Sequence, residues 1–294
     1  MRIAVLIKQV PATDKVKIDK KTGTMIRENL ESELNPLDMY AIEEAVKIKK
    51  NYEDIEIVAI TMGPPFAKDV IKDAISMGVD KGYLVSDRKF SGSDTWATAY
   101  TLKKVIEKLG KFDIIFTGER ATDGETGQVG PSVGTQLGLP VLTYVSKILS
   151  LKKDCITVER SIEGGKEKLE AELPVVISVI KEINEPRIPN FAGKMRAKKA
   201  EIPILTAEDI EPNPKKIGLL GSPTRVVNVY YPKMTRRGKI LKMKDPETCV
   251  DELIKFSVRK CDECGVHFTY FNDETSCRRC TIEEEEAKSL WGIQ

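Results

Sequence analysis

The chain has 294 residues, of which 41% are hydrophobic and 31% charged, enough to bury one large core or two smaller ones. Its formal net charge of +2 gives no strong overall field, which argues against nucleic-acid binding. No apolar run reaches the roughly 18 residues that cross a bilayer. The opening residues, MRIAVLIKQV, are predicted to form a strand rather than a signal peptide. We therefore expect a cytoplasmic chain with reduced thiols.

Strand and helix patterns alternate over the first 180 residues. Short runs rich in Val and Ile are predicted strands, at residues 2–8, 55–61, 82–87 and 112–118. Several of these runs are apolar on both faces, which is typical of a sheet covered on both sides. The repeated strand–helix order predicts an α/β fold with a doubly wound, Rossmann-like, mostly parallel sheet.

Capping residues mark the predicted helix boundaries. Asn35 is expected to be an N-cap, with Pro36 at the first helical position. The glycines at positions 78, 110 and 138 are expected to end three later helices.

The pattern changes after residue 154. Residues 155–180 are predicted to form two strands joined by Gly164 and Gly165, as a hairpin at the sheet edge. Residues 184–245 are rich in proline and basic residues, and we expect them to lack regular structure or to lie along another protein as an extended arm. The sequence thus divides into an α/β domain (1–183), this arm (184–245) and a small four-cysteine module with an acidic tail (246–294).

A glycine-rich loop follows the predicted strand that ends at Gly118. It reads GERATDGETGQVGP and leads into a helix. Glycines let a backbone approach a ligand, and a helix N-terminus favours an anion. Thr126 and Gln128 are candidate donors to a phosphate, although an ordinary glycine-rich connection fits the pattern equally well. The loop contains neither a Walker lysine motif nor G-x-G-x-x-G.

Several segments, in chain order, resemble landmarks of the electron transfer flavoprotein beta subunits. They are IKQVP, NPLDMYAIEEAVKIK, GERATDGETGQVGP, VERSIEGGKEKLEAELPVVISV and INEPRIPNFAGKMRAKK. One departure is Val179, where the family usually has a small residue. The resemblance implies a Rossmann-like fold, a heterodimer with an alpha subunit, and a nucleotide in this chain. That nucleotide is AMP in simple electron carriers and a second FAD in the electron-bifurcating branch, which DGETGQVGP and SDTWAT resemble.

The resemblance also implies cofactor-binding positions. Those expected at the adenine and ribose end are Leu6, Lys8, Asn35 and Met62. Those expected at the ribose and phosphates are Gly118, Asp123, Gly124, Thr126, Gly127, Gln128 and Val129. Thr95 and Thr98 are expected at the flavin end, whereas Trp96 is interpreted as a packing residue.

The family further implies the chemistry and the partners. NADH would reduce the FAD, and electrons would pass to ferredoxin or flavodoxin and, through the FAD of the alpha subunit, to a quinone oxidoreductase or an acyl-CoA dehydrogenase-type partner. We expect no catalytic residue in this chain, NADH oxidation only in the complex, and membrane association only through partners. Phe191, with Lys194 and Arg196, is expected to dock the partner.

Four cysteines near the C-terminus form two Cys-x-x-Cys pairs: Cys261 with Cys264, and Cys277 with Cys280. Four thiolates suit tetrahedral zinc, and the alternatives are a rubredoxin-like iron or a 4Fe-4S cluster. Two other interpretations of the whole chain remain. A universal-stress-type ATP-binding protein would explain the first 180 residues but not the docking segment, and the acidic residues 283–286 weigh against a nucleic-acid-binding zinc ribbon.

Overall fold

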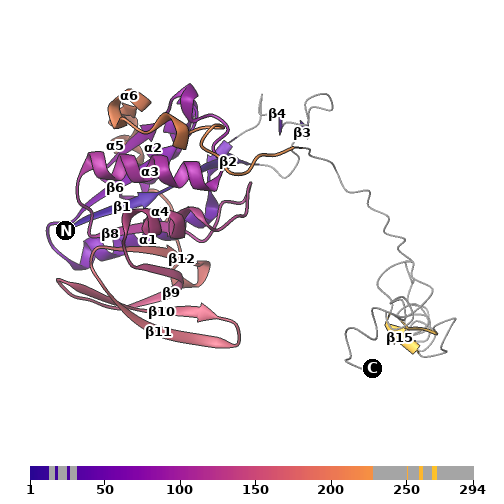
Figure 1. The fold of residues 1–294 in the computed structure, drawn as a ribbon. Helices are drawn as coiled ribbons and strands as arrows, with labels where there is room; N and C mark the ends of the chain where they lie inside the picture. The colour runs from indigo at the N-terminus through magenta and orange to yellow at the C-terminus, as the bar shows by residue number, and fades with distance from the viewer. Residues whose placement is uncertain are drawn as a thin grey trace. The chain divides into compact units, whose positions relative to one another are not determined.

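A computed structural model of the chain describes residues 1–12, 17–18, 25–26, 32–227, 250, 258–260 and 267–269. The chain divides into two compact units, Met1–Tyr230 and Tyr231–Gln294. The first unit is built on a sheet flanked by helices, with the N-terminal strand β1 near its centre (Figure 1).

Within the described residues, the sheet has nine strands in the order β11-β10-β9-β12-β8-β1-β6-β7-β13. Seven of them pair in parallel: β1 (Arg2–Leu6), β6 (Glu56–Met62), β7 (Lys81–Val85), β8 (Ile114–Gly118), β9 (Val141–Leu151), β12 (Val175–Val179) and β13 (Ile204–Leu205). Two antiparallel strands complete one edge: β10 (Cys155–Ile162) and β11 (Gly165–Glu172). Two short ribbons lie outside the sheet: β2 (Gln9–Pro11) with β5 (Ser32–Leu34), and β3 (Lys17–Ile18) with β4 (Met25–Ile26).

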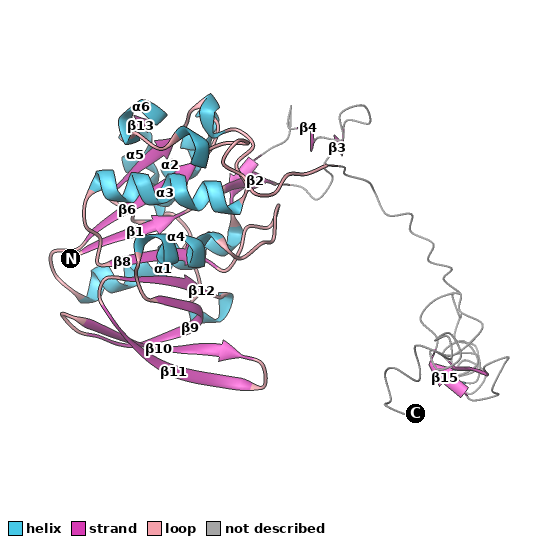
Figure 2. Cartoon of the chain, in the orientation of Figure 1, coloured by secondary structure: helices cyan, strands magenta, loops and turns pink. Residues whose placement is uncertain are grey.

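Helices cover both faces of the sheet (Figure 2). One face carries α1 (Pro36–Asn51), α2 (Lys68–Met77) and α5 (Phe191–Lys199). The other carries α3 (Thr95–Leu109), α4 (Val129–Leu137) and α6 (Ala207–Ile210). Four 3-10 turns connect these elements: η1 (Pro65–Ala67), η2 (Arg88–Phe90), η3 (Lys181–Ile183) and η4 (Pro214–Lys216).

The continuous apolar runs of the strands follow from this double cover. Along β1, Ile3 and Val5 enter the core beneath α1 and α2, whereas Ala4 and Leu6 enter the core beneath α3 and α4. Successive side chains of a strand point to opposite faces, so a strand covered on both sides buries every residue.

The direction of winding reverses between β1 and β8. From β1 the chain proceeds through α1, β6, α2 and β7 toward one edge, and α3 then carries it back across the opposite face to β8. In such sheets the crevice beyond the carboxyl ends of the two strands at the reversal is where ligands bind. The arrangement confirms the predicted doubly wound, mostly parallel α/β fold.

The edge hairpin is also confirmed, but residues 155–180 form three strands where two were predicted. β10 and β11 pair in antiparallel fashion and turn through Gly164, which has φ of +82°. After Pro174 the chain returns to the middle of the sheet as β12, between β9 and β8. The predicted second strand is therefore two strands with different neighbours.

The expectation that the chain lacks regular structure after residue 183 is wrong for its first part. The segment contains α5, β13 and α6, and β13 pairs with β7. Arg187 forms a bidentate ion pair with Glu43 of α1, at 2.6 and 2.7 Å, and Arg196 Nη2 donates to the carbonyl of Ile75, at 2.6 Å. These elements have nine, two and four residues, which is too short for a clear periodic pattern.

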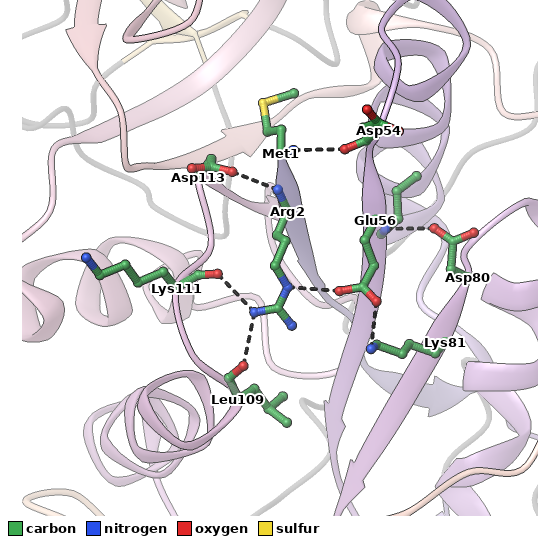
Figure 3. Close-up of polar contacts among 10 residues, drawn as sticks. Met1, Arg2, Asp54, Glu56, Asp80, Lys81, Leu109, Lys111 and Asp113 are labelled. Carbon is green, nitrogen blue, oxygen red and sulfur yellow. Dashed lines mark hydrogen bonds and ion pairs between the residues drawn. The ribbon is translucent and has the colours of Figure 1, made fainter.

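The amino ends of the strands are joined by an ion-pair network (Figure 3). Glu56 accepts from Arg2 Nε at 2.8 Å and lies 2.6 Å from Lys81 Nζ. The Asp113 carboxylate accepts from the Arg2 backbone N–H at 2.7 Å. These side chains are about one-third exposed or more, so each pair contributes little stability.

The second unit contains one described pair of strands. β14 (Val258–Lys260) and β15 (His267–Thr269) are antiparallel, with Lys260 opposite His267. The cysteines predicted to bind metal, at 261, 264, 277 and 280, lie outside the described residues. In the part of the chain that the structure describes, no helix has the length and apolar character needed to cross a membrane.

Candidate functional site

The strands β1 and β8 end side by side at the reversal of the sheet, with Leu6 opposite Thr117. The next residue of β8, Gly118, touches the start of α1. A Cβ at this position would lie 2.4 Å from Asp38 Oδ1 and 2.8 Å from the backbone of Leu37. Only glycine permits this approach, which brings the beginning of α1 against the end of β8.

Asp38 occupies the junction of β1, β8 and α1. Its side chain belongs to the first turn of α1, is only 5% exposed, and accepts from the Lys8 backbone N–H at 2.7 Å. Burial raises the pKa of Asp38 to about 7, and hydrogen bonds from Asn35 and from the backbone of Lys8 and Gly118 limit the rise. The sequence offered only a weak signal, since an acidic residue in a first helical turn is ordinarily at the surface.

Asn35 precedes α1 as predicted, but its side chain does not cap that helix. It is fully buried. Its Nδ2 donates to the carbonyl of Arg120 at 2.9 Å, and its Oδ1 accepts from the Thr122 backbone N–H at 3.2 Å. Asn35 therefore holds the loop that follows β8, which we name the switch loop (residues 119–128).

Lys8 reaches the same loop from the end of β1. Its Nζ lies 2.6 and 2.8 Å from the two carboxylate oxygens of Asp123. The pair neutralises an acidic side chain that would otherwise repel a phosphate, and it fixes the loop relative to β1.

The switch loop leads into α4, and no side chain among the described residues caps the first N–H groups of this helix. Gly127 has φ of +62°, and among the described residues Gln128 makes no side-chain capping bond to the helix. The hydroxyl of Thr117 is buried without a hydrogen-bond partner in that part of the chain, and it lies beside the first turn, 2.6 Å from where a Cβ of Gly130 would be. Uncapped N–H groups at a helix start form a site for an anion.

The start of α3 faces the switch loop. Thr95 Oγ1 lies 3.5 Å from Thr126 Oγ1, a contact longer than a good hydrogen bond. Thr98 follows one turn later on the same side of the helix. Trp96 is 49% exposed, so it is not part of the buried core of the described residues.

The structure thus gathers most of the expected cofactor positions at one edge. One cluster surrounds Asp38 and consists of Lys8, Asn35, Gly118 and Asp123. A second lies at the start of α4, where Thr95 contacts Thr126 beside Gln128 and Val129. Met62 ends β6, two strands from β8. Their roles toward a cofactor stay predictions, as does that of Gly124, which has open space around it.

The expected docking residues lie on α5, on the α1–α2 face. Phe191 begins this helix and is 80% exposed, and Ile188 before it is 90% exposed. Lys194 is exposed, whereas one guanidinium nitrogen of Arg196 is used to fix α5 to α2. No group of three or more His, Cys, Asp or Glu side chains suited to a metal occurs among the described residues.

Comparison with known proteins identifies the family of this chain. The model of the electron transfer flavoprotein domain matches residues 22–210. The chain belongs to the electron transfer flavoprotein family. An electron transfer flavoprotein subunit beta from Thermoanaerobacterium thermosaccharolyticum is 46% identical over 82% of this chain and 92% of its own length.

Two further relatives carry more specific names. The caffeyl-CoA reductase-Etf complex subunit CarD of Acetobacterium woodii is 44% identical over 82% of this chain and 92% of its own length. The protein FixA of Azorhizobium caulinodans is 40% identical over 79% of this chain and 85% of its own length. The electron transfer flavoprotein match includes the switch loop and α5 but ends before the cysteine pairs.

Replacing Asp38 tests its place at the junction. The pKa of Asp38 in the folded chain, about 7, lies above the value of 3.8 for an unperturbed Asp carboxyl. The folded chain therefore holds this proton more tightly than the unfolded chain, and the proton's contribution to the free energy of unfolding is complete below pH 3.8. That contribution falls as pH rises to about 7, by about 1.4 kcal/mol per unit. Asp38→Asn cannot titrate, so its stability relative to the unsubstituted chain should rise between pH 5 and pH 8.

The measurement is urea unfolding of both chains at the two pH values. Asp209→Asn is the control, because hydrogen bonds from Thr206 lower the pKa of Asp209 and this carboxylate stays ionised across the range. The difference in free energy of unfolding between Asp209→Asn and the unsubstituted chain should therefore be the same at both pH values. A constant difference for Asp38→Asn would contradict the raised pKa.

Proposed function

We propose that this chain is the beta subunit of a heterodimeric, electron-bifurcating electron transfer flavoprotein and binds FAD at the carboxyl edge of its sheet. The partner is an alpha subunit with its own FAD, and NADH is the electron donor. A bound FAD would supply the chemistry of accepting a hydride from NADH and releasing its two electrons singly, one toward ferredoxin or flavodoxin and the other, through the alpha subunit, toward a quinone oxidoreductase or an acyl-CoA dehydrogenase-type partner. The family membership sets aside the universal-stress-type alternative.

The observation that supports a bound nucleotide most directly is the open start of α4 at the reversal of the sheet. Its first N–H groups bind phosphate oxygens, assisted by the helix dipole. The unpartnered hydroxyl of Thr117 beneath this turn offers a further polar group. Thr126 and Thr95, in contact across the loop, orient the ligand on the α3 side, while Lys8 and Asn35 hold the loop from the β1 side.

The relatives named CarD and FixA favour the bifurcating form of the proposal. The name of CarD places that protein in a caffeyl-CoA reductase–Etf complex, which is an acyl-CoA-linked assembly. The alternative is a simple electron carrier with AMP in the same site, since AMP presents an adenine, a ribose and a phosphate to the same groups.

Cofactor counting decides between these forms. We expect the chain purified with its alpha subunit to contain two FAD per heterodimer and to oxidise NADH only when both acceptors are present. Gly130→Ala, which places a Cβ 2.6 Å from Thr117 Oγ1, should lose the FAD of this subunit. Gly165→Ala, with no atom within 4 Å of its Cβ, should retain both. One FAD and one AMP per heterodimer would contradict bifurcation.

The exposed start of α5 is proposed as the partner-docking surface. Phe191 supplies an apolar anchor, and Lys194 and the basic residues that follow it supply positive charge around it. The ion pair of Arg187 with Glu43 holds this segment on α1, so the anchor is presented with little loss of conformational freedom on binding.

Phe191→Ala should slow electron transfer to the dehydrogenase-type partner by about tenfold or more, as for a buried interface anchor. Flavin content and the rate at which NADH reduces the bound flavin in the isolated heterodimer should not change. Ile162→Ala, at an exposed apolar residue on the tip of the edge hairpin, is the control. Equal transfer rates for Phe191→Ala and this control would rule out the docking role.

The cysteine pairs are proposed to bind one structural zinc ion. The described strands β14 and β15 pair on either side of the sequence 261–266, and that sequence contains Cys261 and Cys264. A Cys-x-x-Cys between two paired strands is typical of zinc-binding hairpins, and Cys277 and Cys280 would complete a set of four thiolates.

Metal analysis of the purified full chain should find about one zinc per chain. Cys277→Ser should lose the metal, whereas Cys155→Ser, a partly exposed thiol in β10, should keep it. Iron in place of zinc, with visible absorption that does not come from flavin, would show that the site is a rubredoxin-like or 4Fe-4S centre instead.

A further inference from the structure

The first turn of α3 is held by a segment that lies about 130 residues later in the chain. We name residues 213–224 the strap. Its middle residue Ile217 is buried in the core beneath α3, and its beginning lies on Tyr100, whose hydroxyl accepts from the Asn213 backbone N–H at 3.1 Å. The strap is therefore part of the first unit and covers the amino-terminal half of α3.

Backbone contacts fix the strap to the residues just before α3. The Gly218 N–H donates to Ser93 Oγ at 3.1 Å, and the Leu219 N–H donates to the Ser91 carbonyl at 3.1 Å. Gly218 has φ of +57°, and a Cβ there would lie 2.2 Å from the Lys89 carbonyl oxygen. The two segments touch backbone to backbone at Gly218, where only glycine permits this approach.

Asp94 joins the strap to the helix through separate oxygens. Its Oδ1 accepts from the Ala97 N–H at 3.0 Å and caps α3. Its Oδ2 accepts from both the N–H and the hydroxyl of Thr224, at 2.9 and 2.8 Å. The Asp94 N–H donates to Ser222 Oγ at 2.8 Å. One carboxylate thus accepts hydrogen bonds both from the start of α3 and from a distant segment. Hydrogen bonds to an ionised group are stronger than those between neutral groups.

The residue after Asp94 belongs to the candidate site. Thr95 Oγ1 lies 3.5 Å from Thr126 Oγ1 of the switch loop. A displacement of the helix cap would change this separation directly, because Thr95 is the first residue of α3.

We propose that the strap, through Thr224 and Asp94, positions the first turn of α3 for the nucleotide received by the switch loop. The inference rests on the proposed function of that loop. Asp94 is a positioning residue: it acts on the ligand through Thr95 and does not itself contact it. A strap with a purely structural role would affect stability and leave nucleotide affinity unchanged.

Two substitutions separate the cap from the strap contact. Asp94→Asn keeps an oxygen that caps α3, since Asn is as good an N-cap as Asp, but turns an amide toward the Thr224 N–H. Thr224→Val keeps the shape of the side chain and removes the hydroxyl donor. In the heterodimer stripped of nucleotide, each variant should bind FAD and AMP about tenfold more weakly than the unsubstituted chain. The loss of affinity in the double variant should not exceed the larger of the two single losses, because both substitutions break the same contact.

The control is Asn190→Ala, which removes the N-cap bond of α5, from the Gly193 N–H at 2.8 Å, on the opposite face of the sheet. It should lower the urea midpoint and leave both affinities unchanged. Because coupling between sites is reciprocal, added nucleotide should also slow amide hydrogen exchange at Leu219 and Thr224 in the unsubstituted chain and less so in Thr224→Val.

Each outcome has a distinct meaning. If the unsubstituted heterodimer binds nucleotide and both strap variants bind it equally well, the positioning role is overturned and the proposed function stands. If the unsubstituted heterodimer binds neither FAD nor AMP in this subunit, the proposed function is overturned and this inference with it.

Discussion

A single buried carboxyl group organises the carboxyl edge of this sheet. Asp38 accepts from the backbone of Lys8 at the end of β1 and contacts Gly118 at the end of β8, from its place in the first turn of α1. An unpaired N–H buried at this point would cost roughly 1–3 kcal/mol, so the carboxyl stabilises the junction although its own burial is unfavourable. The two residues that hold the switch loop, Lys8 and Asn35, are both placed by this junction.

The two faces of the sheet carry different parts of the proposed electron path. On the α1–α2 face, the Glu43–Arg187 pair and the Arg196 bond hold α5 and its exposed Phe191. On the α3–α4 face, the strap holds the start of α3 beside the switch loop. The exposed start of α5 and the strap therefore lie on opposite faces of the sheet, so the two proposed roles can be altered by separate substitutions.

Local patterns in the sequence predicted much of this fold, because they depend on neighbouring residues. The central strands, the glycines that end the helices and the glycine-rich loop before α4 were all indicated by such patterns. The features that were missed depend on contacts between distant segments: Asn35 bonds to residue 120 instead of capping its helix, and Asp94 bonds to Thr224. Short elements such as β13 take their structure from the strand they join, and metal binding by the cysteine pairs, which lie outside the described residues, remains a prediction.

The ends of the sheet bear on how this chain meets other proteins. The outer strand β11 reads GKEKLEAE and forms cross-strand ion pairs with β10, Arg160 with Glu167 and Lys166 with Glu159. The strand at the other end, β13, has two residues. A charged edge and a very short edge both discourage the addition of a further strand. Association with other proteins by β-augmentation is therefore disfavoured at either end, which leaves the side-chain surfaces of the helices and loops for contacts with other proteins.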